Sequence, residues 1–103
     1  PLGTTQLLNA VWGNQIAKVR QLLDQGAAVN QAKTPDGVSP LYIAAEKGYT
    51  EVVGLLIDGG AAVNQARTDF GGTPLYVATQ NCHTEVARLL IDAAAKVNQA
   101  TTN

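Results

Sequence analysis

A repeat with one fixed period constrains the fold of this chain more than any other feature. The tripeptide Pro-Leu-Tyr occurs at 40–42 and again 34 positions later, at 74–76. The tetrapeptide Val-Asn-Gln-Ala occurs three times at the same interval, at 29–32, 63–66 and 97–100. Because each copy is one small unit that cannot bury its apolar face alone, the copies must stack on one another. The period therefore predicts a chain built from three stacked repeats.

Within one copy, the pattern indicates two short helices joined by a turn. In the second copy, Ser39 can cap the first helix and Pro40 can occupy its first position, where a missing N–H costs nothing. Gly48 and Gly60 follow the two apolar stretches, as expected of helix-ending residues with a left-handed backbone. Apolar residues at helical spacing are predicted to form the buried seam of this copy. These residues are Leu41, Ala44, Ala45, Val52, Val53, Leu56 and Ile57.

The second copy also carries short motifs in a fixed order, and the third copy shares part of them. Residues 39–42 and 73–76 read Ser/Thr-Pro-Leu-Tyr, residues 48–53 read Gly-Tyr-Thr-Glu-Val-Val, and residues 55–64 end in Ala-Ala-Val-Asn. In these motifs the chain resembles the ankyrin-repeat family, with Tyr in place of the family's His. The period of 34 also departs from the family's usual interval of about 33 residues. The resemblance implies an all-α ankyrin-repeat solenoid of three helix-turn-helix repeats joined by hairpin-like loops.

The repeat period also sets the expected domain boundaries. We assign residues 4–103 to a single domain, with repeats at 4–36, 37–70 and 71–103. Residues 1–3 resemble the remainder of a cleaved expression tag and are left outside the fold. The first copy has a polar surface, which is what a terminal capping repeat needs.

The third copy keeps the apolar seam but loses both helix-ending glycines. Cys82 and Ala94 stand where the second copy has Gly48 and Gly60. A left-handed residue other than Gly costs about 1–2 kcal/mol. Either the backbone accepts this strain or the second helix continues through the alanines at 93–95, which favour a helix. We therefore expect the third repeat to be the least stable.

Composition narrows the classes of function. The net charge is −1 and 15% of the residues are charged, whereas a nucleic-acid surface needs a concentrated basic face. No apolar run approaches the roughly 20 residues of a membrane span, and no signal-peptide pattern opens the sequence. One cysteine provides no disulfide framework. We expect a cytoplasmic monomer that binds no nucleic acid and does not insert into a membrane.

Few residues could carry catalysis. His83 and Cys82 are the only residues of their kinds, and neighbouring positions do not share a helix face. His83 also occupies the position of the His in the family's Gly-His-x-Glu motif, which favours a structural role. Gly71-Gly72 is followed by neither Lys-Ser nor Lys-Thr, so it fits a hairpin turn better than a phosphate-binding loop. We predict that the protein is not an enzyme and holds no cofactor or metal ion.

The family resemblance implies instead that the chain binds another protein on its concave side, which the hairpin tips and first helices form. At these positions the three copies differ while their core positions agree. Such variation is typical of a recognition surface, although drift at solvent-exposed positions gives the same pattern. The candidate partner-binding residues are Trp12, Lys33, Asp36, Val38, Glu46, Lys47, Arg67, Asp69, Phe70, Gln80 and Asn81.

Trp12 and Phe70 stand out because buried aromatic residues supply much of the binding energy at protein interfaces. The alternative for Trp12 is a lid packed over the terminal repeat, and for Phe70 it is packing against a neighbouring hairpin. A rival function is a structural spacer, or a fragment of a larger multidomain scaffold or enzyme, with no partner of its own. A third interpretation, an engineered binder, is disfavoured by the period of 34 and the free Cys82.

The resemblance also implies a modification hypothesis. Asparaginyl hydroxylases modify ankyrin repeats at the Asn of the Val-Asn turn, often with Leu eight residues earlier. Asn30, Asn64 and Asn98 all have Leu at that distance. The alternative is that these side chains only bridge the turn by hydrogen bonds, and we favour that alternative.

Overall fold

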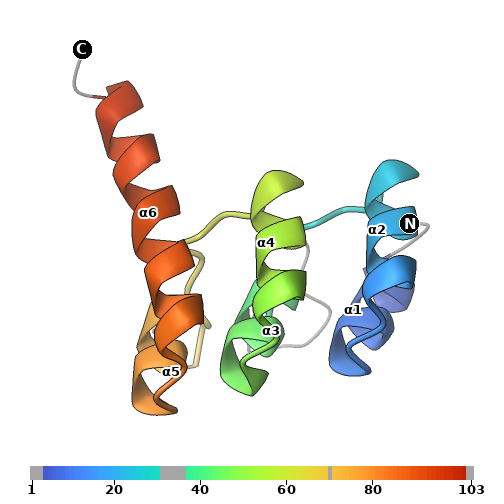
Figure 1. Ribbon diagram of the computed structural model, residues 1–103, viewed down its shortest axis with the longest axis horizontal. Coiled ribbons are helices and arrows are strands. Elements are labelled where there is room, and N and C mark those ends of the chain that lie inside the picture. Colours follow the sequence, from blue (N-terminus) through green and yellow to red (C-terminus); the bar gives the residue numbers. More distant parts are fainter. Residues whose placement is uncertain (1–3, 31–36, 70, 102–103) are drawn as a thin grey trace.

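The computed structural model describes residues 4–30, 37–69 and 71–101, and each repeat contributes two helices joined by a short turn (Figure 1). These residues contain helices and no strand, as the helical spacing of apolar residues and the family resemblance implied. The helices are α1 (Thr4–Trp12), α2 (Ile16–Asp24), α3 (Pro40–Lys47), α4 (Thr50–Asp58), α5 (Pro74–Gln80) and α6 (Thr84–Thr101). None of them is long and apolar enough to cross a membrane.

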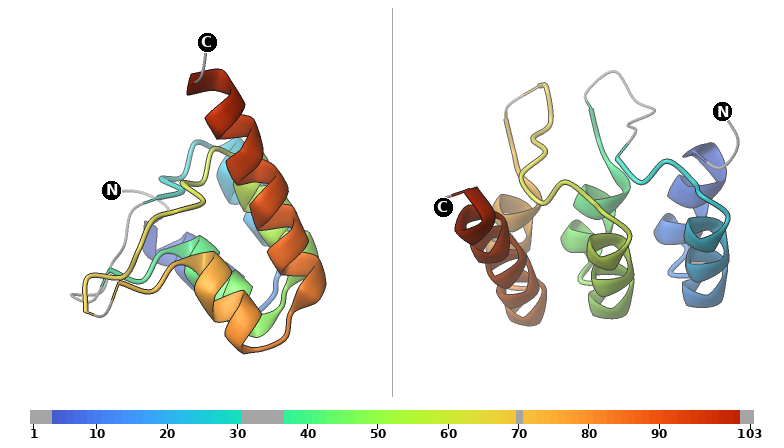
Figure 2. Two further views of the ribbon diagram at one scale, coloured as in Figure 1. Left: turned by 90° about the vertical axis from the view of Figure 1, so that its left-hand side faces the viewer. Right: turned by 90° about the horizontal axis from the view of Figure 1, so that it is seen from above.

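The helices form two layers (Figure 2). In the inner layer, α3 lies between α1 and α5 and contacts both, and in the outer layer α4 lies between α2 and α6 in the same way. The loop that joins α4 to α5 projects sideways from the helices. This arrangement confirms the predicted all-α solenoid, in which each repeat contacts only its neighbours.

The inner helices begin as the sequence predicted. The Oγ of Ser39 accepts a hydrogen bond from the backbone N–H of Tyr42 at 3.2 Å, with Pro40 at the first helical position of α3. One repeat later, the Oγ1 of Thr73 accepts from the N–H of Tyr76 at 3.1 Å. Each cap satisfies a donor that the first turn of a helix leaves without an intrahelical partner.

The turn between the two helices of each repeat has one left-handed residue at the same repeat position. Asn14, Gly48 and Cys82 have φ of 55°, 74° and 63°. The third repeat therefore keeps this turn without glycine and accepts the strain. At the position of Gly60, the third repeat instead avoids a left-handed residue by continuing its helix. Gly60 has φ of 96° and follows the end of α4, whereas α6 continues through Ala94.

The core runs through all three repeats as one cluster. Six of the seven predicted seam residues of the second repeat are buried, namely Leu41, Ala44, Ala45, Val52, Val53 and Leu56. The seventh, Ile57, is half-buried at the edge of the cluster. The helical spacing of apolar residues thus identified the packed face of each helix.

The two ends of the stack differ in polarity. The first repeat exposes Lys18 at the position where the second repeat buries Val52. This replacement agrees with the capping role predicted for the first copy. The third repeat leaves Tyr76 49% exposed and Ile91 53% exposed, whereas Tyr42, one repeat earlier, is only 3% exposed.

Asn30 ties the first repeat to the second. Its Nδ2 donates to the carbonyl oxygen of Gly60 at 3.2 Å, and its Oδ1 accepts from the N–H of Ala62 at 2.6 Å. The Nε2 of Gln65 also donates to the main-chain oxygen of Asn30 at 3.0 Å. Asn64 makes no matching side-chain bonds within the described part of the chain. The reason is that α6 continues where the first two repeats turn.

Candidate functional site

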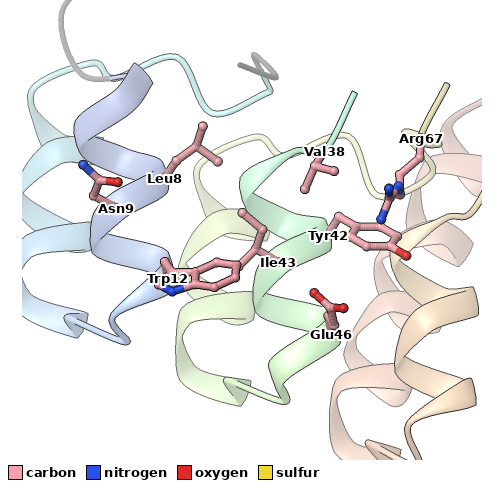
Figure 3. A pocket seen from close by; sticks show the side chains of 8 residues that line it. All are labelled: Leu8, Asn9, Trp12, Val38, Tyr42, Ile43, Glu46 and Arg67. Atoms are coloured by element: carbon pink, nitrogen blue, oxygen red, sulfur yellow. The ribbon is translucent and has the colours of Figure 1, made fainter. Parts of the chain in front are cut away.

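A groove lies on the inner layer between α1 and α3, with Arg67 of the loop that joins α4 to α5 at its far side (Figure 3). Its volume is about 370 Å³. Apolar and aromatic side chains form most of its lining, and polar or charged groups lie around them. The lining residues are Leu8, Asn9, Trp12, Val38, Tyr42, Ile43, Glu46 and Arg67.

Trp12 forms one wall of the groove and is 58% exposed. The Nζ of Lys47 lies 4.1 Å from the centroid of its ring, close enough for a cation–π interaction. The hydroxyl of Tyr49 donates to the main-chain oxygen of Trp12 at 3.4 Å. The tryptophan is therefore held at the junction of two repeats with more than half of its surface in solvent. This exposure argues against a lid packed over the terminal repeat.

The opposite wall is Tyr42, whose ring is also covered by a cation. The Cζ of Arg67 lies 5.2 Å from the ring centroid. Arg67 in turn donates from Nε and Nη2 to the two carboxylate oxygens of Asp69, at 3.1 and 2.6 Å. This bidentate pair fixes the guanidinium plane. The sequence signalled Arg67 and Asp69 as tip residues, and the structure brings both to the edge of the groove.

Glu46 projects from α3 beside Tyr42, with its carboxylate at the rim of the groove (Figure 3). The end of α3 is fixed by the third repeat, because Asn81 Nδ2 and His83 Nε2 both donate to the main-chain oxygen of Glu46 at 3.0 Å. The His83 ring also packs against Gly48, where a Cβ atom would lie 2.6 Å from it. His83 therefore has the structural role expected of it, and Asn81 shares that role.

The structure brings together part of the predicted binding set. Trp12, Val38, Glu46 and Arg67 line the groove, Lys47 covers the Trp12 ring, and Asp69 orients Arg67. Gln80 is exposed near the end of α5, and Asn81 follows that helix, so neither lines the groove. Lys33, Asp36 and Phe70 lie outside the described residues.

Sequence reasoning missed four lining residues: Leu8, Asn9, Tyr42 and Ile43. Tyr42 belongs to the repeated Pro-Leu-Tyr motif and Ile43 follows it directly, and the repeat pattern assigned neither residue to the binding surface. Spacing offered a signal, since Leu8 lies four residues before Trp12 and Tyr42 four residues before Glu46. Residues four apart share a helix face. Leu8 and Trp12 therefore share the face of α1 that lines the groove, and Tyr42 and Glu46 share the corresponding face of α3.

The three candidate hydroxylation sites have different surroundings. The side-chain bonds of Asn30 across the repeat junction support the interpretation that this residue bridges the turn. Asn64 is exposed, and Asn98 lies within α6 rather than in a turn. The modification stays a prediction. Within the described part of the chain, no three His, Cys, Asp or Glu side chains gather as a metal site requires.

Comparison with known proteins agrees with the geometry of the stack. The family model described as ankyrin repeats matches residues 7–101 with three copies. A search of curated proteins found no relative that matches this chain. The matched range covers five of the six helices in full and all of α1 except its first three residues, and it includes the turn residues and helix caps described above. The chain therefore belongs to the ankyrin-repeat family.

Proposed function

We propose that this chain binds a partner protein through the groove between α1 and α3, and that it does so without catalysing a reaction. Ankyrin repeats are generally protein–protein interaction modules. The proposal rests mainly on Trp12. Its side chain is 58% exposed, and the Nζ of Lys47 lies over its ring. Covering this aromatic surface would remove a large apolar area from water.

The physical reason to place the binding energy here is preorganisation. A side chain that is already ordered loses less rotational freedom when a partner covers it. Trp12 is contacted by Lys47, and its main-chain oxygen accepts from Tyr49. Interface hot spots are enriched in tryptophan, tyrosine and arginine, and the groove contains one of each: Trp12, Tyr42 and Arg67.

The direct test is affinity capture from extract of the cells that naturally produce the protein. The immobilised chain is compared with Trp12→Ala and with Ile91→Ala. Ile91 is a matched control, because it is 53% exposed and belongs to α6 in the outer layer. We expect a protein that the wild type and Ile91→Ala retain and Trp12→Ala loses. Retention of the same proteins by all three chains would show that Trp12 does not carry the binding, and retention of no protein by any of them would favour the spacer role.

A further inference from the structure

We propose that the groove recognises a polypeptide segment in which a bulky apolar residue lies within about three positions of an arginine or lysine, with the basic side chain meeting Glu46. This inference rests on the proposed function and adds the chemistry of the partner. The apolar residue would enter between Trp12 and Tyr42, above Ile43 (Figure 3). The basic residue would reach the carboxylate at the rim.

The apolar part follows from the lining. Ile43 is 7% exposed, Tyr42 is 3% exposed, and Leu8 and Val38 are half-buried, so an entering group would meet a surface that is already packed. The volume of about 370 Å³ falls within the roughly 300–1,000 Å³ of small-ligand pockets. A side chain the size of leucine or phenylalanine therefore suits this space.

The charge expected of the partner depends on which charged side chains at the groove already contact another group of this chain. Lys47 lies over the Trp12 ring. Arg67 lies over Tyr42 and is paired with Asp69. Both nearby cations thus have anionic or aromatic neighbours.

Glu46 differs from these groups. Only its main-chain oxygen accepts hydrogen bonds, from Asn81 and His83. Its carboxylate has no hydrogen-bond or ion-pair partner within the described part of the chain, and the residue is exposed. The charge available to a partner on the groove is therefore negative.

Because the Glu46 carboxylate is unpaired within the described part of the chain, a partner that covers it must supply a cation. A partner that covers the groove removes water from the Glu46 carboxylate, and a carboxylate without a compensating donor is strongly disfavoured at an interface. A cation in the partner restores the lost interactions. Arginine suits the position best, because its planar guanidinium can bind a carboxylate in a bidentate manner and stack on a neighbouring ring.

The repeat geometry sets the spacing of the two residues. Trp12 and Glu46 occupy the same repeat position, 34 residues apart, on adjacent inner helices. Packed helices lie roughly 8–10 Å apart. An extended segment advances about 3.3 Å per residue. A segment that spans from one side chain to the other therefore needs about three residues.

The test is selection of a phage-displayed random heptapeptide library on the wild-type chain, followed by titration of synthetic peptides. Trp12 is the only tryptophan, so its fluorescence reports directly on the groove. We expect enrichment of an apolar residue near Arg or Lys. Changing that basic residue to Glu in the peptide is expected to weaken binding about ten-fold or more. Glu46→Lys should reverse this preference, and Glu46→Gln should abolish it.

The matched control is Glu51→Lys, because Glu51 is an exposed glutamate on α4 in the outer layer. This variant should keep the wild-type preference, and circular dichroism verifies that each variant is folded. Peptides that quench or shift Trp12 fluorescence without a charge preference, or with a preference for acidic residues, would overturn the inference and leave the proposed function standing. Peptides that bind without affecting Trp12 fluorescence and tolerate Trp12→Ala would overturn both. A selection that enriches no peptide also counts against the inference.

Discussion

The Nζ of Lys47, the last residue of α3, lies 4.1 Å from the centroid of the Trp12 ring at the end of α1. The contact joins the first and second repeats and restricts the side chain of Trp12, which is 58% exposed. Cation–π contacts at exposed sites contribute about 0.5–1 kcal/mol. This is small for stability but matters for binding, because it orders the tryptophan before a partner arrives.

Replacing Lys47 with glutamine is expected to loosen Trp12. The variant loses the cation while keeping a side chain of similar length, so unfolding free energy should fall by no more than about 1 kcal/mol. Time-resolved fluorescence anisotropy of the single tryptophan should show faster local rotation than in the wild type. Lys18→Gln, an exposed lysine on α2, is the control and should leave the decay unchanged. Identical decays for Lys47→Gln and the wild type would mean that the contact does not order the ring.

Asn30 and Asn64 offer a matched pair for the repeat junction. Asn30→Ala removes two side-chain hydrogen bonds to the second repeat, those to Gly60 and Ala62. We expect a loss of about 1–2 kcal/mol, since a net hydrogen bond contributes about 0.5–1.5 kcal/mol and the site is exposed. Asn64→Ala should cost less than about 0.5 kcal/mol, as for surface substitutions generally. Chemical denaturation measures both, and equal losses would contradict this assignment.

Cys82 and Ala94 stand where the second repeat has glycine. Replacing each with glycine should change the unfolding free energy in opposite directions. Cys82 has φ of 63°, so Cys82→Gly is expected to raise the unfolding free energy by about 1 kcal/mol. Ala94 lies inside α6, so Ala94→Gly should lower it by about 0.5–1 kcal/mol. Thermal or urea unfolding distinguishes the two signs. Stabilisation by Ala94→Gly would show that the helix ends before this residue in solution.

Amide exchange should follow the position of each repeat in the stack. Residues 52–57 of α4 have neighbours on both sides and include three side chains with no exposed surface, Val52, Val53 and Leu56. We expect slow exchange there. The amides after Leu90 belong to the third repeat, which packs against the second repeat only, so they should exchange faster. Uniform protection across both segments in a hydrogen-exchange measurement would contradict this expectation.

The repeat period predicted that three copies stack, and the apolar spacing together with the resemblance to the ankyrin-repeat family implied that each copy is a pair of helices. The caps at Ser39 and the buried seam followed from local chemistry and helical spacing, and the structure confirms both. The sequence did not decide whether Ala94 forms a left-handed turn or continues the helix. A strained turn and a continued helix differ by about 1 kcal/mol there, which residue preferences alone do not resolve.

The groove was predicted less completely than the fold. Period arithmetic placed Trp12 and Glu46 at equivalent positions, and the structure shows both at the groove. It did not reveal that the neighbouring Lys47 reaches the Trp12 ring, because this depends on side-chain conformations across a repeat junction. Tyr42 was likewise assigned to a motif, and its role as a wall follows only from the contact with Arg67.

The most direct test of the central claim compares partner binding and folding stability in Trp12→Ala, with Leu41→Ala as the reference for a core position. The binding measurement uses the partner captured by the wild type. We expect Trp12→Ala to weaken binding by about 2 kcal/mol or more, roughly 30-fold in Kd, with little change in Tm. Leu41 is 2% exposed, and Leu41→Ala should lower stability by about 2–5 kcal/mol. If Trp12→Ala instead unfolds the protein as Leu41→Ala does, or binds the partner as tightly as the wild type, the groove is not the binding site that we propose.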